Sequence, residues 1–428
     1  MALHTSKALR NQVIYSVFVR NHTPEGTFEG LRRDLPRIKA LGADIIWLLP
    51  VHPIGEVRRK GSLGSPYAIR DYRAVNPEYG TLEDFRRLTE EIHALGMKCM
   101  MDVVYNHTAP DSVLAHEHPE WFYRRPDGSF GNRVGDWTDI IDLDYSQTGL
   151  WDYQIDTLKY WAQYVDGFRC DVAPLVPLDF WLRARAAVEE VRPGCLWLAE
   201  SVEPGFITHL RGRGFGCLSD SELYQAFDLC YDYDIHEHLR DYLTGRAPLE
   251  RYARAVNQQE AIYPDNYVKL RFLENHDRPR AAFLIPDGKA LRSWTAFSFF
   301  QKGTALIYAG QEAGCTHLPS LFDRDPVDWS GPDRTDLFRR LAALKKHPLF
   351  TDSVYRVDAL PGGFLLASHT GRAGRLLGLF SARGAAGVVP VDAPDGTYEN
   401  LLDGSAAEVR DGLLSTCGEP VIIEPAVS

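Results

Sequence analysis

A basic and an acidic side chain stand two positions apart in the segment Gly167-Phe-Arg-Cys-Asp171. Alternate residues of a strand face the same side, so Arg169 and Asp171 would point together and Cys170 the opposite way. A guanidinium beside a carboxylate favours its ionised form. An ionised carboxylate fixed at a strand end can act as a nucleophile, although a purely structural ion pair has the same pattern. The rest of the chain must decide between these two interpretations.

Three further segments end predicted strands in polar groups. They are Asp102-Val-Val-Tyr-Asn-His107, Ala199-Glu200 and Glu274-Asn-His-Asp277. Crowded carboxylates repel one another when ionised, so one of them tends to keep a proton at neutral pH. An ionised carboxylate facing a protonated one is the pair that glycosidic-bond cleavage needs: one attacks the anomeric carbon and the other protonates the leaving oxygen. Histidines beside this pair can hydrogen-bond neutral sugar hydroxyls.

Strand and helix signals alternate along the first 350 residues and would position these groups. The apolar, β-rich runs that predict strands are 13–19, 44–49, 98–105, 165–171, 195–200, 225–231, 267–272 and 304–308. Helical spacing of apolar residues predicts helices over 30–41, 81–95, 149–164, 178–191, 236–257 and 336–346. The alternation indicates parallel strands with crossover helices, and eight such units predict a closed (β/α)₈ barrel. The carboxyl ends of barrel strands share one rim, which would bring the polar groups together.

Two segments depart from this alternation. Residues 106–147 are polar and aromatic with turn signals, so we expect a small excursion domain after the third strand. Over 350–428, short apolar runs alternate with Gly, Asp and Pro turns, which predicts a C-terminal all-β sandwich. The catalytic barrel would then comprise residues 1–105 and 148–349.

The composition narrows the class of protein. With 45% hydrophobic residues in 428, the chain can bury a large core, and disorder is excluded. The net charge of -11 and pI near 5.7 argue against a nucleic-acid or anionic-membrane partner. No run approaches the ~20 apolar residues of a membrane span, and no signal peptide is recognisable. Seven cysteines without regular spacing favour a reducing, cytoplasmic location. The oligomeric state stays open.

The four strand-end segments, in this order, resemble the signatures of glycoside hydrolase family 13, the α-amylase family. The run Gly303-Thr-Ala-Leu-Ile-Tyr-Ala-Gly-Gln-Glu312 resembles the family's sequence around the eighth strand. The resemblance covers about residues 13–329. It implies a (β/α)₈ barrel with a short domain B after the third strand and a β domain C at the C-terminus.

The resemblance implies a role for each matching catalytic position. Asp171 would be the nucleophile that forms a covalent glycosyl intermediate, and Glu200 the general acid/base. Asp277 would bind sugar hydroxyls and stabilise the transition state. Arg169 would orient Asp171 and count among the substrate-binding residues. Tyr67 would stack on the sugar as an aromatic platform. Further contacts to the sugar would come from Asp102, His107 and His276.

Tryptophans outside these motifs offer further stacking surfaces for sugars. Trp329 lies in the loop after the eighth predicted strand, near the expected cleft, where it could bind substrate or simply pack. We expect Trp121 and Trp137 to belong to the core of the excursion domain instead.

Two features bear on ligands other than the glucan. Asn106 matches the family's calcium-binding asparagine, but no other calcium ligand can be identified; we expect that no cofactor is required and that calcium is the one candidate. The loop His52-Pro-Ile-Gly-Glu-Val-Arg-Arg-Lys-Gly61 resembles that of the family's maltosyltransferase branch, which moves maltosyl units to and from phosphate. Its basic residues Arg58, Arg59 and Lys60 could meet a phosphate or be solvated loop charges.

These observations predict a retaining enzyme that hydrolyses α-1,4-glucosidic bonds in maltooligosaccharides or related short glucans. The alternative is an α-glucan transglycosylase or maltosyltransferase using the same covalent intermediate. A non-catalytic binding or scaffold subunit is the third reading; such relatives usually lack part of the carboxylate trio, which this chain retains. Substrate length and linkage are decided by loops rather than by the fold.

Overall fold

The short apolar runs of the sequence form eight parallel strands that close into a barrel in the computed structural model, which describes residues 4–426. The barrel strands are β1 (Val13–Val17), β2 (Ile45–Leu48), β3 (Lys98–Val103), β6 (Gly167–Cys170), β7 (Leu196–Ala199), β8 (Leu229–Tyr231), β9 (Lys269–Arg271) and β10 (Thr304–Tyr308). Parallel pairing of β1 with β10 closes the ring. The predicted (β/α)₈ barrel is therefore confirmed.

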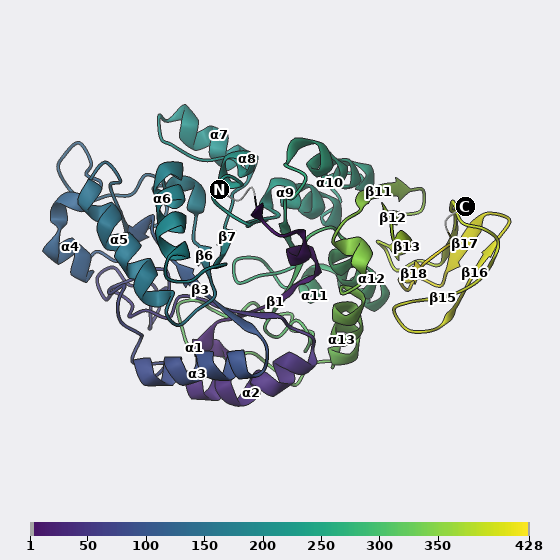
Figure 1. Ribbon diagram of the computed structural model, residues 1–428, viewed down its shortest axis with the longest axis horizontal. Coiled ribbons are helices and arrows are strands. Elements are labelled where there is room, and N and C mark those ends of the chain that lie inside the picture. The colour runs from purple at the N-terminus through teal and green to yellow at the C-terminus, as the bar shows by residue number, and fades with distance from the viewer. Residues whose placement is uncertain (1–3, 427–428) are drawn as a thin grey trace.

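Helices surround the barrel, as Figure 1 shows. They are α1 (Val19–His22), α2 (Phe28–Ala40), α3 (Leu82–Ala94), α5 (Thr148–Trp161), α6 (Leu178–Glu189), α7 (Pro204–Gly212), α8 (Asp220–Leu223), α9 (Tyr233–Leu243), α10 (Leu249–Ile262), α11 (Ala281–Leu284), α12 (Gly288–Phe300) and α13 (Thr335–Leu344). Short 3₁₀ turns occur at Lys7–Asn11, Pro119–Trp121, Ala173–Leu175 and Pro348–Phe350. Helix α12 was not predicted from the sequence: most of its residues are buried, so it lacks the polar face that marks a surface helix.

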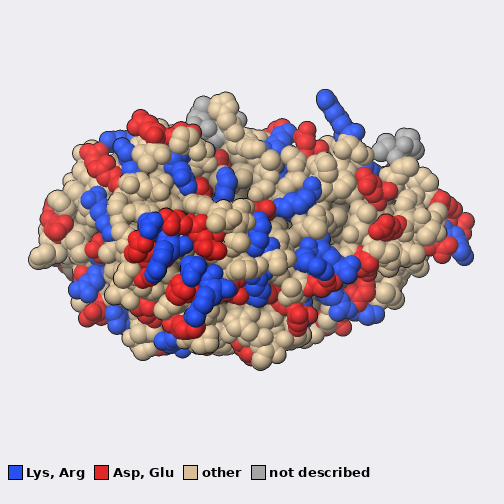
Figure 2. Space-filling view, turned by 60° about the horizontal axis from the view of Figure 1, so that its bottom comes forward, with Lys and Arg blue, Asp and Glu red and all other residues tan. Residues whose placement is uncertain are grey.

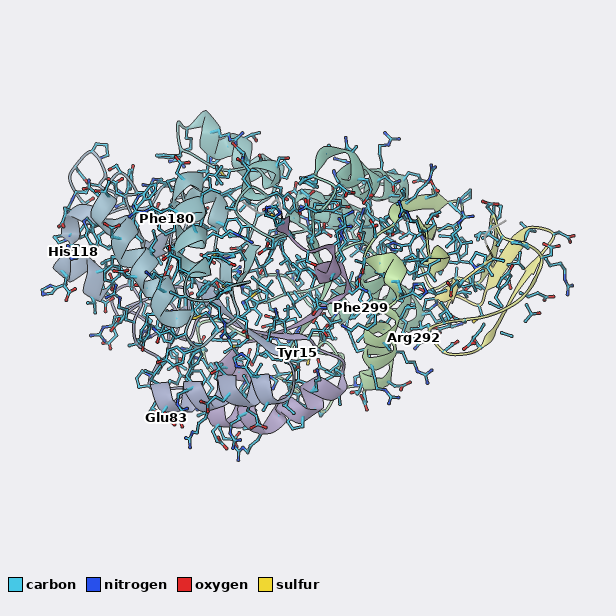
Figure 3. All side chains as sticks on the ribbon, in the orientation of Figure 1. Tyr15, Glu83, His118, Phe180, Arg292 and Phe299 are labelled. Atoms are coloured by element: carbon cyan, nitrogen blue, oxygen red, sulfur yellow. The ribbon has the colours of Figure 1, made fainter. Side chains whose placement is uncertain are left out.

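The segment between β3 and α5 leaves the barrel after its third strand. It contains α4 (Val113–Glu117) and a two-stranded sheet, β4 (His107–Thr108) with β5 (Ile141–Asp142). Figure 1 shows α4 at the edge of the molecule farthest from the C-terminal strands, and Figure 3 places His118 beside it. Pairing of β4 with β5 places His107 opposite Asp142 and so joins the two ends of the excursion.

Residues 354–423 form two antiparallel sheets, which confirms the predicted all-β C-terminal region. One sheet has the order β11-β12-β13-β18 and the other β14-β17-β16-β15. Their bounds are β11 (Val354–Leu360), β12 (Phe364–Gly371), β13 (Gly374–Ser381), β14 (Gly387–Pro390), β15 (Gly396–Glu399), β16 (Ala406–Arg410), β17 (Leu413–Thr416) and β18 (Val421–Ile423). Helix α12, labelled at Arg292 and Phe299 in Figure 3, joins barrel and sheets through the Phe300–Phe380 ring contact at 5.4 Å.

The surface around α2 and α3 carries both signs of charge. Figure 2 shows lysines and arginines interspersed with aspartates and glutamates on this face. Within residues 4–426, no helix is long and apolar enough to cross a membrane.

Candidate active site

The predicted carboxylate trio meets at the carboxyl-end rim of the barrel. Asp171 follows β6, Glu200 follows β7 and Asp277 follows β9, and all three line one cavity of about 350 Å³. The barrel ladder continues one residue past each strand, because the Asp171 N–H donates to Val103 and the Glu200 N–H donates to Cys170. Hydrogen bonds of the backbone therefore fix the positions of both residues, independently of their side chains.

Arg169 lies beneath the cavity and contacts three carboxylates. Its Nη1 is 2.9 Å from Asp171 Oδ1 and 2.9 Å from Asp102 Oδ1, and its Nη2 is 3.0 Å from Glu200 Oε2. The strand register makes this possible, since Asp102 on β3 stands directly opposite Arg169 on β6. Arg169 and Asp102 are fully buried and do not line the cavity, so they position the carboxylates from behind rather than contact a ligand.

Burial separates the protonation states of the carboxylates. It raises the pKa of Glu200 to about 8, against the opposing charge of Arg169. It raises the pKa of Asp102 to about 7 in the same way. Burial acts to raise the pKa of Asp277, but the charge and hydrogen bond of His276, with the charges of Arg169 and Arg278, leave that pKa lowered. Glu200 is thus protonated at neutral pH and suited to act as an acid.

The expectation that Arg169 lowers the pKa of Asp171 needs correction. Burial raises that pKa above its usual range, and the guanidinium only opposes the shift. The sequence showed the Arg–Asp spacing, but it did not show that one guanidinium is shared among three carboxylates in a dry site. Arg169 and a protonated Glu200 both favour the ionised form of Asp171.

The turn after Asp171 is strained and holds Glu200. Val172 has φ of 35°, a left-handed conformation that is an outlier for a β-branched residue. In this conformation its backbone N–H donates to Glu200 Oε2 at 2.8 Å. Such strain costs on the order of 1–3 kcal/mol and is typical of functional sites. Nothing in the sequence marked Val172 as unusual.

Tyr67 and His276 form a stacked pair at one wall of the cavity. Their ring centroids are 5.4 Å apart with an interplanar angle of 14°. The Tyr67 hydroxyl is 2.7 Å from His276 Nε2 and donates to Asp102 at 3.1 Å. His276 Nε2 also lies 3.0 Å from Asp277. Tyr67 lines the cavity, whereas His276 supports it from behind.

His107 reaches the cavity as a neutral hydrogen-bond donor. Burial lowers its pKa to about 4. The Asn106 amide nitrogen is 3.1 Å from His107 Nδ1 and donates to it, so the proton of the neutral ring resides on Nε2. That Nε2 lies 4.0 Å from Asp171 Oδ2. A neutral N–H beside the nucleophile suits a sugar hydroxyl.

The surroundings of Asn106 do not fit a calcium site. The Asn106 amide nitrogen points to Asp142 Oδ1 at 3.3 Å, and a nitrogen is not a calcium ligand. Arg133 Nη1 lies 3.3 Å from Asp142 Oδ2 and donates to the Leu143 carbonyl at 3.1 Å. A guanidinium thus occupies the position beside this fully buried carboxylate. Among the described residues, no three His, Cys, Asp or Glu side chains are grouped to hold a metal.

Removal of the Arg133 guanidinium is expected to destabilise the protein. Arg133→Ala leaves Asp142, which is fully buried, without its cation, and breaking such a pair costs about 3–5 kcal/mol. The midpoint of urea unfolding, read by circular dichroism, should fall accordingly. Arg124→Ala, on an exposed side chain of the same excursion, serves as the control. If EDTA lowered the wild-type midpoint, a bound metal rather than Arg133 would hold this region.

Trp329 does not lie in the catalytic cavity, which corrects the expectation that it sits near the cleft. Its Nε1–H donates to the His22 carbonyl at 3.0 Å, and the side chain lines a second cavity. The long loop after β10 approaches the catalytic cavity only at Leu321 and Phe322 and then turns away. The direction of this loop could not be read from the sequence.

Several residues that line the catalytic cavity were not predicted to do so. Trp137 was expected in the core of the excursion domain, but it also lines the cavity and lies 5.6 Å from the His107 ring. The other unpredicted lining residues include Ser65, Asp139, Val202, Glu203, Phe206, Tyr233, Arg278 and Phe322. They come from loops, and only their closeness to a recognised motif, as for Arg278 beside Asp277, could have indicated them.

Three loops meet at the cavity through Lys60. Its Nζ is 2.8 Å from Asp139 of the excursion and 6.0 Å from the centroid of Phe322 in the loop after β10. Ser62 strengthens this junction by donating to Asp323 at 2.7 Å. The basic loop was expected either to meet a phosphate or to carry solvated charges. Lys60 instead pairs with the carboxylate of Asp139 in the lining of the cavity.

The rim of the barrel thus holds a buried, protonated carboxyl group beside two further carboxylates in one cavity. The model of the α-amylase catalytic domain matches residues 10–137 and 117–336, and that of the bacterial α-amylase C-terminal domain matches residues 356–423. The chain belongs to the α-amylase family, glycoside hydrolase family 13.

Solved structures of the same family match the whole chain. An α-amylase from Lactobacillus plantarum is 52% identical, with a TM-score of 0.95 over 98% of this chain and 99% of that one. A noncanonic maltogenic α-amylase, AmyB from Thermotoga neapolitana, is 33% identical, with a TM-score of 0.86 over 98% and 100%.

Curated relatives carry a different activity in their names. An α-1,4-glucan:maltose-1-phosphate maltosyltransferase from Pseudomonas aeruginosa is 36% identical over 74% of this chain and 50% of its own length. Two others match over 36% and 33% of their lengths, so this chain spans half or less of these curated relatives.

Proposed function

We propose that this chain is a retaining α-1,4-glucan-active enzyme that passes a glycosyl unit from a maltooligosaccharide to the hydroxyl of another sugar. One observation carries the proposal: a single buried guanidinium holds the oxygens of Asp171 and Glu200 at 2.9 and 3.0 Å. Glu200 also hydrogen-bonds to Asp171, so the two carboxyl groups lie next to each other. Neighbouring carboxyl groups favour direct attack on the sugar, whereas an inverting enzyme needs a wider gap for water.

The first step forms the covalent intermediate. Asp171 attacks the anomeric carbon as the bond to the leaving oxygen breaks, and Glu200 gives its proton to that oxygen. Asp277, whose pKa is lowered, stays ionised and stabilises the positive charge that develops on the sugar ring. His107 and Tyr67 hold the sugar from the same cavity.

The second step returns the proton and releases the enzyme. An acceptor hydroxyl attacks the anomeric carbon, its proton goes to the Glu200 carboxylate, and the ester bond to Asp171 breaks. Two inversions at one carbon leave the product with the α configuration of the substrate.

The lining next to Glu200 favours a sugar over water as acceptor. Val202 and Phe206 follow Glu200 along the chain and line the cavity with it, and we assign the acceptor to this wall. Tyr233 adds a second aromatic ring to this wall. Apolar and aromatic surfaces bind the faces of sugar rings and offer water few hydrogen bonds.

The charge of the cavity favours a neutral acceptor over phosphate. Its two cations are both paired: Lys60 with Asp139 at 2.8 Å, and Arg278 with Glu203. The carboxylates of Asp171 and Asp277 add further negative charge to the lining. An anionic acceptor would meet this field without a free cation, whereas a sugar hydroxyl carries no charge. Transfer therefore fits the geometry, but transfer to phosphate fits less well.

Hydrolysis is the second candidate. The specific observation that favours it is the similarity over 98% of this chain to a structure named as an α-amylase. The two reactions share the first step, and they differ only in whether water or a sugar attacks the intermediate.

Product analysis of a maltoheptaose digest, with and without phosphate, is expected to separate these fates. Transfer gives products longer than maltoheptaose in both samples, in addition to shorter ones, because the acceptor is another sugar chain. Chromatography of the products, with proton NMR of the first anomer, is the measurement.

Each other outcome of this digest has its own meaning. Shorter products alone would establish a hydrolase. Maltose 1-phosphate formed only with phosphate would contradict the argument from the cavity's charge. An initial β anomer would exclude the double displacement.

A further inference from the structure

A second cavity of about 600 Å³ lies between α2 and the loop after β10, lined by none of the residues of the catalytic cavity. Its volume falls within the ~300–1,000 Å³ that is typical of small-molecule sites. Trp329 stands in its wall with 36% of its surface exposed, whereas Trp47, Trp161, Trp181, Trp197 and Trp294 are buried.

Trp329 is held rigidly, as a binding platform must be. Its Nε1 donates to the His22 carbonyl at 3.0 Å, and the His22 ring meets it edge-on with centroids 5.3 Å apart. The Arg37 guanidinium lies 4.6 Å from the centre of the Trp329 ring and covers one face. The exposed area of Trp329 therefore belongs to a ring that is already oriented, so binding costs little conformational entropy.

Ordered polar groups form the floor of this cavity. Arg37 contacts Asp34 and Glu312 at 2.8 Å each, and Glu312 accepts a hydrogen bond from the Tyr15 hydroxyl at 2.5 Å. Figure 3 labels Tyr15 on β1, above the purple helix α2. The network ties the cavity floor to the barrel itself. Side chains locked in this way present fixed hydrogen-bonding groups to a ligand.

His22 offers a polar atom that has no partner. Its Nε2 lies 2.7 Å from Asp34, whereas no hydrogen-bond partner reaches its Nδ1 within residues 4–426. His22 is 1% exposed and lines the cavity. Asp34 is a charged acceptor, because its hydrogen bonds from His22 and Arg37 outweigh burial and lower its pKa to about 2. The Nε2–H is therefore donated to Asp34, and Nδ1 is left as a buried acceptor for a donor such as a hydroxyl.

We infer that this cavity is a second α-glucan-binding site, with Trp329 as the stacking platform and His22 Nδ1 as an acceptor for a sugar hydroxyl. The choice of glucan rests on the proposed function, because a chain that acts on α-glucans meets them at high local concentration. A flat, fixed aromatic ring beside ordered polar groups is what binding a sugar requires: an apolar face for the ring and hydrogen bonds for its hydroxyls.

The charges of the cavity exclude an anionic ligand. Arg33 and Arg37 are its cations, and each is already paired with carboxylates: Arg33 with Glu25 at 2.8 Å, and Arg37 with Asp34 and Glu312. Asp333 adds another carboxylate at the rim. A phosphate would face more negative than positive charge, whereas a neutral sugar accepts hydrogen bonds from guanidinium and donates them to carboxylate groups.

One loop serves both cavities. The segment after β10 supplies Leu321 and Phe322 to the catalytic cavity and Trp329 to the second one. Asn21 connects the two parts, since its side-chain nitrogen donates to the Ser320 carbonyl at 2.7 Å and its oxygen accepts from the Asp325 N–H at 3.0 Å. A glucan held at Trp329 therefore stays beside the loop that borders the catalytic cavity.

Calorimetric titration of maltoheptaose into the Asp171→Asn enzyme tests the inference, because this variant binds without turnover. We expect two sites per chain, and one site after adding Trp329→Ala. Trp329→Phe, which keeps an aromatic ring, should retain two. Phe283→Ala, which removes a ring that is 66% exposed and lines neither cavity, is the matched control and should also retain two.

The outcomes separate failure of this inference from failure of the proposed function. A single site already present in Asp171→Asn, or two sites that both persist after Trp329→Ala, would overturn the second site and leave the catalytic one. No binding to any variant would overturn the proposed glucan activity and this inference with it. Maltoheptaose-soaked crystals of Asp171→Asn give a readout that does not depend on Trp329→Ala folding: sugar density against Trp329 supports the site, and an empty cavity at saturating concentration rejects it.

Discussion

Asp171→Asn is expected to lower kcat/KM for maltoheptaose by at least about 10⁴-fold, a loss typical of removing a nucleophile. The amide has nearly the same shape as the carboxylate but cannot attack the anomeric carbon. It can still accept the hydrogen bond from Arg169 Nη1 through its oxygen. The change therefore separates chemistry from architecture, and steady-state kinetics with a sensitive reducing-sugar assay would measure it.

Binding and folding should survive this substitution. We expect maltoheptaose affinity within a few-fold of wild type and an unchanged circular dichroism spectrum. Asp152→Asn, on an exposed aspartate of α5, is the matched control and should keep full activity. Near-native turnover by Asp171→Asn would show that the nucleophile lies elsewhere in the cavity.

Glu200→Gln is expected to lower kcat/KM for maltoheptaose by about 10³-fold, the size of a general-acid contribution. The leaving sugar is a poor leaving group and needs a proton as it departs. A maltosyl fluoride needs no such proton, so its cleavage by the variant should stay within about tenfold of wild type. Glu237→Gln, which changes an exposed side chain of α9, is the control and should keep full activity. Equal losses on both substrates would argue that Glu200 does not supply the proton.

The dependence of kcat/KM on pH in the wild-type enzyme should also report the protonation of Glu200. Burial raises the pKa of Glu200 to about 8, and only the protonated form can act as the acid. The value of kcat/KM for maltoheptaose should therefore fall tenfold per pH unit above that pH. With maltosyl fluoride this alkaline limb should vanish. A limb that persisted with the fluoride would belong to another group.

Most of the barrel could be predicted because its signals are local. Residues 45–49, for example, are all apolar, as is typical of a strand buried on both faces. The run 225–231 predicted too long a strand, because Ala226 and Phe227 are buried without joining β8. Helix α12 was missed for the opposite reason: burial on nearly all sides removed the polar stripe by which periodicity reveals a helix.

The residues of the active site likewise fall into those that could be predicted from the sequence and those that could not. Residues at strand ends could be placed from the sequence, because parallel strands deliver their carboxyl ends to one rim. Asp171, Glu200, Asp277 and His107 accordingly meet in one cavity. Tyr67 lies on the long loop after β2 and was placed there only by its resemblance to the family's motif. Residues on long loops could not be placed, since the direction of a loop depends on contacts far away in the chain. For this reason Trp329 was wrongly expected near the cleft, and Trp137 was not expected to line it.

The sequence by itself determined which chemical groups this protein has and on which rim they converge, since residue type and strand order are local properties. Only the tertiary structure decided what those groups do there. Burial of Glu200, the sharing of Arg169 among three carboxylates and the Lys60–Asp139 contact all join distant parts of the chain. A pKa and a binding surface depend on everything within a few ångströms, whatever its distance in sequence.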